Sequence, residues 1–252
     1  MNLKLITLTN KGYLEYTQNL IESLKKLNIS NKLEIYCIDQ VSFNFLKNKY
    51  NENMVYYVQN NYNISDIQLF RDGNWNKVVY YKFQIIKENL DKGYDVLFTD
   101  GDIVFLKNPF EYLKNNVNEY DLLFQEDVLP DEKDNKSTLA TKKEDPLHYS
   151  KDEICTGFMF AKCNNNNKIL FDSKSIDIEK FVCDQLYVND LKNHLNYKLL
   201  DRDLFPSGYY YYTQKSFRDN DLDKNAFIIH FNYNTPWLKT GYMKKYGKWF
   251  LD

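Results

Sequence analysis

Stretches of continuous apolar residues alternate along the chain with stretches whose apolar residues recur every three or four positions. Residues 3–9 and 32–39 are continuous runs of the first kind, which are typical of buried strands. Between them, residues 12–28 place their apolar side chains on one helical stripe. The opening of the chain therefore predicts a strand, a helix and a second strand.

The same alternation continues to the end of the chain. Further strands are predicted at 53–58, 94–100, 154–163 and 226–233, and further helices at 41–50, 75–93, 182–195 and 237–252. Gly93 closes one of these helices, as glycine often does. Strands that are apolar throughout are buried on both faces, as in parallel sheets. The pattern predicts an α/β fold with a mostly parallel central sheet flanked by helices.

The chain length suits one domain. At 252 residues and 43% hydrophobic content the chain can bury one sizeable core, and no repeat or linker divides it. We predict a single domain over residues 1–252. Residues 126–153 are polar, charged and long for a connection, which favours a flexible flap over packed structure.

Charge and cysteine content narrow the function classes. The net charge of −2 provides no basic excess to neutralise a nucleic-acid backbone, so we expect no DNA or RNA partner. Four cysteines without a Cys-x-x-Cys pair argue against a zinc site or a disulfide framework. The first ten residues are too short and interrupted for a signal peptide, and no apolar run could span a bilayer. A soluble, cytoplasmic protein without an integral membrane segment is expected.

Two aspartates interrupt the apolar run at 94–110, which reads YDVLFTDGDIVFLKNPF. Asp100 and Asp102 are like charges one residue apart, and such a pair is costly unless a cation lies between them. Gly101 lets backbone and ligand approach closely. The pair follows a predicted strand, and open α/β sheets bind ligands beyond the carboxyl ends of their strands. A divalent metal site is predicted here, with an ordinary acidic surface turn as the alternative.

One histidine and one lysine near the end of the chain are further candidates. His230 ends the predicted strand FIIHFNY, and imidazole is an ordinary third ligand for Mn²⁺. Its alternative is a core histidine hydrogen-bonded to the backbone. Lys239, in TPWLKTG, could lie over a phosphate beside that metal, with a solvated surface lysine as the alternative.

The order of these motifs resembles one known family, the nucleotide-diphospho-sugar transferases of GT-A fold, which include retaining glycosyltransferases. The similar segments cover nearly the whole chain. They are LITLTNKGYLEYTQNLIESLKKLNI, IYCIDQ, YKFQIIKENLDKGYDVLFTDGDIVFLKNPF, CTGFMFAKC, CDQLYVNDL and IHFNY followed by Lys239. The resemblance implies transfer of a sugar from a nucleotide-diphosphate donor, UDP-sugar favoured, to an acceptor that the sequence does not identify, with retention of configuration.

The resemblance also implies roles for individual residues. Asp100, Asp102 and His230 would hold Mn²⁺, or Mg²⁺, on the donor diphosphate. Lys82 and Lys239 would add positive charge around the phosphates, although Lys82 could instead be a solvated helix residue.

Residues after the first strand would contact the donor nucleotide. Thr9, Asn10 and Tyr13 stand where the family lodges the nucleobase, and Gly101 would lie against the donor. The alternative for Asn10 is simple capping of the following helix.

On the sugar side, the resemblance places Asp184 and Gln185 at the catalytic position, with Gln185 positioning the sugar and stabilising charge. Capping of its helix is the alternative for Asp184. Glu126 and Asp127 could bind sugar hydroxyls. Cys155 stands where many relatives have Asn, which leaves one expected polar contact open.

Two other functions stay open at this point. DGDIV also fits the motif of haloacid-dehalogenase-type phosphatases, in which Asp100 would be a nucleophile. Such enzymes carry the motif on their first core strand, whereas about a hundred residues precede it here. A sugar- or nucleotide-binding module without catalysis is the second alternative, and it predicts that Asp100, Asp102, His230 and Lys239 do not converge.

Overall fold

The computed structural model describes residues 2–50, 54–59, 64–68, 74–127, 153–176, 183–217 and 222–252. The strands are β1 (Leu3–Thr9), β2 (Leu33–Cys37), β3 (Val55–Tyr57), β4 (Asp95–Thr99), β5 (Ile103–Phe105), β6 (Leu122–Glu126), β7 (Ile154–Ala161), β8 (Tyr197–Leu199) and β9 (Ile228–His230). The helices are α1 (Leu14–Lys26), α2 (Gln40–Lys49), α3 (Trp75–Asp91), α4 (Phe110–Asn116), α5 (Asn165–Leu170), α6 (Asp184–Leu191), α7 (Gly208–Phe217), α8 (Leu222–Asn225) and α9 (Pro236–Lys245).

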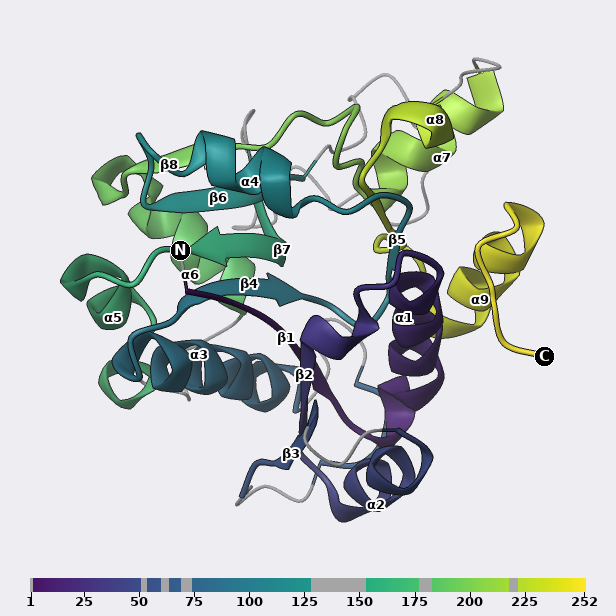
Figure 1. Ribbon diagram of the computed structural model, residues 1–252, viewed down its shortest axis with the longest axis horizontal. Coiled ribbons are helices and arrows are strands. Elements are labelled where there is room, and N and C mark those ends of the chain that lie inside the picture. The colour runs from purple at the N-terminus through teal and green to yellow at the C-terminus, as the bar shows by residue number, and fades with distance from the viewer. Residues whose placement is uncertain are drawn as a thin grey trace, which may run out of the picture.

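Seven strands form the central sheet, in the order β3-β2-β1-β4-β7-β6-β8 (Figure 1). Every neighbouring pair is parallel except the two pairs that β7 makes with β4 and β6. The prediction of an α/β fold with a mostly parallel sheet is confirmed. Because β1, β4 and β6 run in the same direction, they end at one edge of the sheet, where the amino end of β7 also lies.

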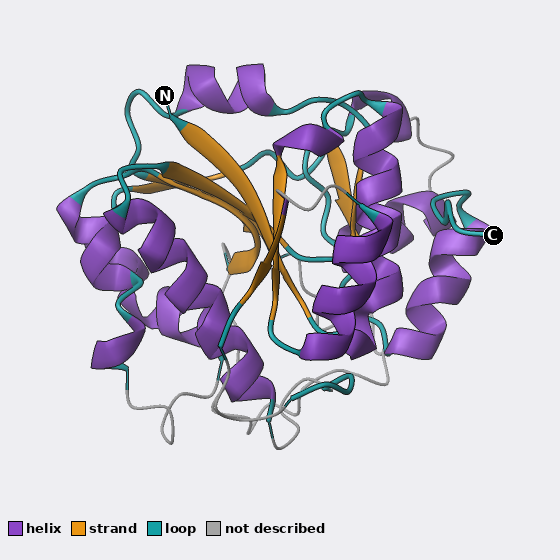
Figure 2. Cartoon of the chain, turned by 60° about the horizontal axis from the view of Figure 1, so that its bottom comes forward, coloured by secondary structure: helices purple, strands orange, loops and turns teal. Residues whose placement is uncertain are grey.

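Helices cover both faces of the sheet (Figure 2). On one face α1 and α2 pack their leucines against side chains such as Leu5 and Leu97 of the strands. On the other face α3, α5 and α6 pack against the alternate residues, among them Ile6 and Phe98. Neighbouring strand residues thus point into two separate cores, which is why the sequence shows continuous apolar runs.

A second, two-stranded sheet lies outside the central one. β5 pairs antiparallel with β9, so that Ile103 lies opposite His230. Aromatic residues of α7 and α9 pack behind it in a third apolar cluster, in which Tyr211 and Phe231 are fully buried. The predicted strand at 226–233 is therefore shorter than expected and belongs to this small sheet. This pairing connects the segment after β4 with the end of the chain.

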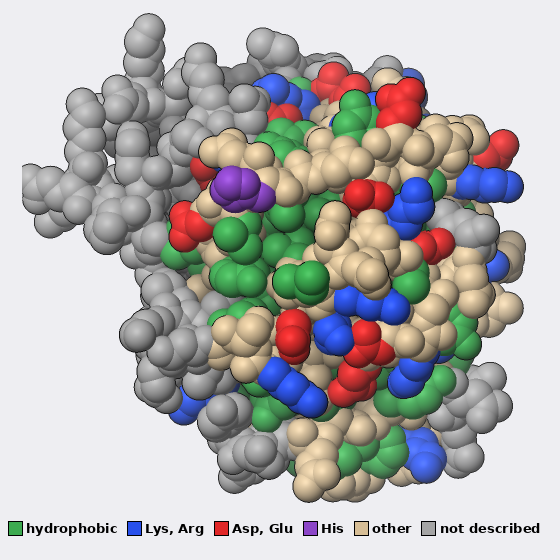
Figure 3. All heavy atoms as spheres, turned by 90° about the vertical axis from the view of Figure 1, so that its left-hand side faces the viewer, with side chains coloured by type: hydrophobic (Ala, Val, Ile, Leu, Met, Phe, Trp, Pro, Cys, Tyr) green, Lys and Arg blue, Asp and Glu red, His purple; other side chains and the backbone are tan. Residues whose placement is uncertain are grey.

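On the face shown in Figure 3, acidic and basic side chains are interspersed. No helix in the described ranges combines the length and hydrophobicity needed to cross a bilayer. All four cysteines are free, and three are buried. The flap predicted at 126–153 lies outside the described residues except for its ends, and the single domain over 1–252 stays a prediction.

Candidate active site

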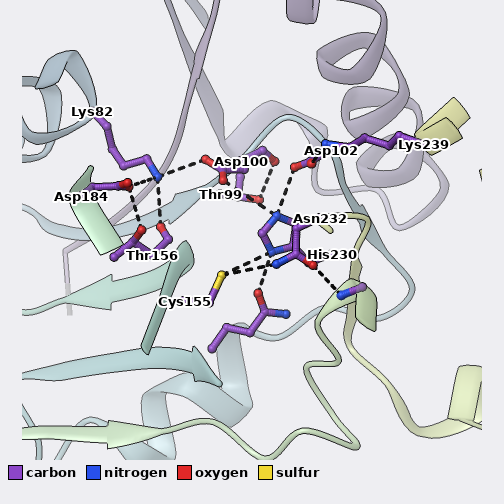
Figure 4. Close-up of polar contacts among 12 residues, drawn as sticks. Lys82, Thr99, Asp100, Asp102, Cys155, Thr156, Asp184, His230, Asn232 and Lys239 are labelled. Atoms are coloured by element: carbon purple, nitrogen blue, oxygen red, sulfur yellow. Dashed lines mark hydrogen bonds and ion pairs between the residues drawn. The ribbon is translucent and has the colours of Figure 1, made fainter. Parts of the chain in front are cut away.

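Asp100, Asp102 and His230 converge on one point beyond the end of β4 (Figure 4). One ligand atom from each lies within 4.8 Å of the other two. His230 Nε2 is 3.2 Å from Asp102 Oδ1 and 3.8 Å from Asp100 Oδ2. Two carboxylates and one imidazole are a ligand set that suits Mn²⁺. The three side chains therefore offer a divalent cation two carboxylate ligands and one imidazole ligand.

Backbone hydrogen bonds hold Asp100, Asp102 and His230 close together, although His230 is far from the aspartates in the sequence. His230 stands in β9 opposite Ile103, and the next amide, that of Phe231, donates to the Asp102 carbonyl at 3.1 Å. On the opposite side lies Gly157 of β7, whose carbonyl accepts from the Asp100 amide at 2.7 Å. A Cβ at Gly157 would come within 2.2 Å of His230 Cε1 and 2.8 Å of Asp100 Oδ2. Glycine is thus the residue that lets the ligand set approach β7.

Two lysines flank the aspartates, one on each side. Lys239 Nζ donates to Asp102 Oδ2, and Lys82 Nζ lies 3.3 Å from Asp100 Oδ1. Only 5% of Lys82 and 7% of Lys239 is exposed, so the alternative of a solvated lysine is wrong for both. Their charges partly neutralise the acidic pair in this arrangement.

The two carboxylates differ in proton affinity. Burial by itself raises the pKa of Asp102, but Lys239 and His230 outweigh it and hold that pKa below its usual range. For Asp100, burial and the neighbouring Asp102 raise the pKa more than Lys82 lowers it. Repulsion between the two carboxylates contributes to the raised pKa of Asp100. A divalent cation between them would lower both pKa values.

Lys82 also reaches the amino end of α6. Its Nζ is 2.5 Å from Asp184 Oδ2 and 3.4 Å from the Thr156 carbonyl, while Thr156 Oγ1 donates to Asp184 at 2.7 Å. The helix cap is Cys183, whose thiol accepts from the Leu186 amide. The capping alternative for Asp184 is therefore wrong, because its carboxylate is used in tertiary contacts.

Asp127 and Gln185 form a second polar pair near the site. Gln185 Nε2 donates to Asp127 Oδ2 at 2.7 Å. The other oxygen, Asp127 Oδ1, is buried and has no hydrogen bond within 3.5 Å among the described residues, although the Asn232 side chain is near enough to lower the pKa of Asp127. A buried acceptor without a close donor is costly, and Asp127 Oδ1 is therefore available to a donor from a bound molecule. Burial raises the pKa of Asp127 to about 6, against the lowering effect of the Gln185 amide.

We predict that Asp127→Asn stabilises the fold in a pH-dependent way. The pKa of Asp127 is about 6 in the folded protein and 3.8 as its ordinary value, so ionisation of Asp127 opposes folding above both values. The variant should gain roughly 2–3 kcal/mol at about pH 7.5, and the gain should vanish as the pH falls towards about 4. Thermal unfolding across this pH range measures it, with exposed Asp91→Asn as control. A gain that is independent of pH would contradict the assignment.

The residues expected to contact the nucleobase are bonded within the chain; Thr9 and Asn10 are buried and Tyr13 is partly buried. Asn10 Oδ1 accepts from the Tyr13 amide, which is the capping alternative, and Asn10 Nδ2 donates to the Asp66 carbonyl. The Tyr13 hydroxyl donates to the Gln68 carbonyl at 3.0 Å. Thr9 accepts from Thr17. Their contact with a nucleotide stays a prediction.

Helix α1 packs so closely against Gly101 that a larger residue would not fit there, which the sequence did not indicate. A Cβ at Gly101 would lie 2.9 Å from Thr17 Oγ1 on α1. The group that approaches Gly101 closely in the structure is therefore helix α1, whereas the sequence analysis expected a ligand. The contact joins the segment between the two aspartates to Thr9 at the end of β1.

Two other residues with predicted roles, Cys155 and Glu126, contact different partners. Cys155 Sγ is buried 3.7 Å from His230 Nδ1, and burial raises the pKa of its thiol. Glu126 Oε1 lies 3.2 Å from the Arg202 guanidinium. Sequence reasoning missed Gln125, whose Oε1 lies 2.8 Å from His230 Nδ1. Its only signal is a polar residue that ends the apolar run of β6.

The known proteins that this chain resembles are glycosyltransferases. The sequence model of the nucleotide-diphospho-sugar transferase family matches residues 28–245. The chain is 26% identical over 297 residues to a UDP-galactose:fucoside alpha-3-galactosyltransferase of Dictyostelium discoideum, covering 100% of this chain and 43% of that protein. It is 27% identical to a UDP-D-xylose:L-fucose alpha-1,3-D-xylosyltransferase of Arabidopsis thaliana, covering 67% of this chain and 48% of that protein. The chain thus spans less than half the length of both relatives.

Among solved structures, mouse xyloside xylosyltransferase 1 has a similar fold. The TM-score is 0.56 at 13% sequence identity, and the match covers 94% of this chain and 99% of that one. The predicted GT-A fold is confirmed by such structural neighbours.

Proposed function

The chain belongs to the nucleotide-diphospho-sugar transferase family, and from this premise we propose that it is a metal-dependent, retaining glycosyltransferase. The observation that supports the proposal best is the convergence of Asp100, Asp102 and His230 beyond the end of β4. The alternative of a non-catalytic module predicts that these residues and Lys239 lie apart, whereas Lys239 bonds Asp102 directly.

Asp100, Asp102 and His230 would hold Mn²⁺ or Mg²⁺. When bound, the cation supplies a Lewis acid that neutralises charge developing on the departing diphosphate. Lys239 bonds Asp102, and Lys82 bonds Asp184 and lies 3.3 Å from Asp100, so both ammonium groups lie beside the aspartates that would hold the cation. In the proposed donor complex they would bind phosphate oxygens and help to stabilise the leaving group.

Asp127 and Gln185 would bind the transferred sugar. Asp127 Oδ1 is buried and has no hydrogen bond within 3.5 Å among the residues that the structure describes, so it could accept one from a sugar hydroxyl. Because the Gln185 amide nitrogen is bonded to Asp127, its oxygen is the atom that remains to face positive charge on the reacting sugar. Neither residue is proposed as a covalent nucleophile.

The donor and acceptor classes can be proposed from the relatives. The names of both relatives specify a UDP-sugar donor, a fucose or fucoside acceptor and an alpha product. UDP-galactose and UDP-xylose carry the sugar in the alpha configuration, so an alpha product means retention. We propose a UDP-hexose or UDP-pentose donor and a deoxyhexose acceptor.

The test is release of UDP from a panel of UDP-sugars, with and without a fucoside acceptor. We expect release to depend on Mn²⁺, to stop with a chelator and to increase with the correct acceptor. A chain that instead releases inorganic phosphate from phosphate esters, and nothing from UDP-sugars, would support the phosphatase alternative and contradict the proposal.

We predict that Gln185→Ala lowers turnover roughly a hundredfold while donor affinity changes little, because its contribution is made in the transition state. Steady-state kinetics give kcat and the KM for the donor. Gln84→Ala, on the outer part of α3, is the matched control. A variant that loses donor affinity with unchanged kcat would contradict this role.

A further inference from the structure

Gln125 is a buried amide whose two ends face different partners. It lies in β6 and is fully buried. Its Nε2 donates to the Phe205 carbonyl at 3.0 Å, and its Oε1 lies 2.8 Å from His230 Nδ1. The Phe205 carbonyl can only accept, so the amide nitrogen must face it. The amide oxygen must therefore face the imidazole.

This orientation determines where the imidazole carries its proton. An amide oxygen cannot donate, so Nδ1 of His230 must be the donor in the 2.8 Å contact. A neutral imidazole with its proton on Nδ1 has a lone pair on Nε2. Nε2 is the atom that faces Asp102 and Asp100, at 3.2 Å and 3.8 Å.

The sheet is irregular where Gln125 lies. Phe124 pairs with Met159, but the next residue, Gln125, pairs with Cys155, so the register between β6 and β7 shifts at this point. Such irregularities redirect side chains and occur next to active sites. The segment after β8 binds both Gln125 and His230. The Phe205 carbonyl accepts from the Gln125 side chain, and the carbonyl of the next residue, Pro206, accepts from the His230 amide at 3.1 Å.

We infer that Gln125 is a positioning residue that holds the His230 imidazole in the tautomer and orientation in which Nε2 can bind the cation. The inference rests on the proposed metal site. Cys155 Sγ also lies near Nδ1, at 3.7 Å, but a thiol is a much weaker acceptor than an amide oxygen. Partners of this kind typically contribute 10–100-fold to metal affinity.

The test uses Mn²⁺ alone, and its binding is followed by the electron paramagnetic resonance signal of free Mn²⁺. Gln125→Met keeps the side-chain length and removes the acceptor, so its Mn²⁺ affinity should fall roughly 10–100-fold. Gln125→Glu keeps an oxygen acceptor on Nδ1, and in its protonated form it can still donate to the Phe205 carbonyl, so it should bind Mn²⁺ about tenfold tighter than Gln125→Met. Equal, wild-type affinity in Gln125→Met would overturn the inference.

Asn89→Leu is the matched control for loss of a buried amide. Asn89 is fully buried and donates to the Ile85 carbonyl near the end of α3. This variant should lower the unfolding temperature while Mn²⁺ affinity stays at the wild-type value. If Asn89→Leu and Gln125→Met weaken Mn²⁺ binding equally, the effect is general destabilisation and the inference fails.

His230→Ala separates this inference from the proposed function. If wild type and His230→Ala bind Mn²⁺ equally, the proposed metal site itself is wrong. If His230→Ala weakens binding and Gln125→Met does not, only the role of Gln125 is wrong.

A measurement on the wild type covers the case in which Gln125→Met does not fold. In Zn²⁺-loaded protein with ¹⁵N-labelled histidine, the ring proton of His230 should couple to Nδ1. A ring proton on Nε2 in the loaded protein would overturn the inference without any variant.

Discussion

Asp102→Asn is expected to abolish metal-dependent binding of the nucleotide diphosphate and to lower turnover roughly a thousandfold or more. Asp102 is 6% exposed and contacts both His230 and Lys239. The variant preserves the side-chain shape and one hydrogen-bond acceptor but removes the negative charge. A cation held by Asp100 and His230 alone loses one of its two anionic ligands, so its affinity and its effect on the leaving group both fall.

Calorimetric titration of UDP with and without Mn²⁺ measures the binding part of this prediction. Wild type should bind UDP more tightly with Mn²⁺, and Asp102→Asn should show no such increase. Asp91→Asn, in an exposed ion pair with Lys87 at the end of α3, is the control and should behave as wild type. Equal Mn²⁺-dependent UDP affinity in wild type and Asp102→Asn would show that Asp102 does not hold the metal.

The sequence predicted the part of the site that lies at the end of a strand. The run of residues 94–99 is apolar enough to be buried on both faces, and the parallel arrangement then places Asp100 at a ligand-binding edge. β4 does end at Thr99, and β1 ends next to Asn10. A local pattern is sufficient here, because the strand and the polar residue that follows it are adjacent in the chain.

Strand direction and sheet membership could not be predicted in this way. Apolar periodicity is the same for a parallel and an antiparallel strand, so the antiparallel β7 carries no distinct signal. The three-residue strands β5 and β9 are held by pairing over more than a hundred residues of chain, which periodicity does not record. The position of His230 opposite Ile103 therefore depends on tertiary structure and could not be predicted from local sequence.

Lys82 and Gln125 differ in whether their roles could have been predicted from the sequence. Lys82 lies on the stripe formed by Val79, Phe83 and Ile86, so its spacing alone indicates a buried lysine that needs an acidic partner. Gln125 has no comparable signal, since its partners Phe205 and His230 are 80 and 105 residues away. Only the folded structure brings these three together.

Lys82→Met is expected to destabilise the fold by roughly 3–5 kcal/mol, because it leaves a buried carboxylate without its cation. Lys82 Nζ is 2.5 Å from Asp184 Oδ2, and both side chains are 6% exposed. Burial by itself lowers the pKa of Lys82, but Asp100 and Asp184 raise it above its usual value, so Lys82 is charged at neutral pH. Thermal unfolding measures the loss, with Lys87→Met on the same helix, where the side chain is 25% exposed, as control.

A double variant separates the structural role of Lys82 from its proposed role at the donor phosphates. Lys82→Met with Asp184→Asn removes both charges, and the Thr156 hydroxyl can still donate to the new amide oxygen. Most of the lost stability should return, because no buried charge is left unpaired at α6. Activity should stay below that of Asp184→Asn alone, because Asp100 and the donor still lack the ammonium group that lies 3.3 Å from Asp100 Oδ1. If turnover recovers together with stability, Lys82 serves only to neutralise Asp184 and does not act on the donor.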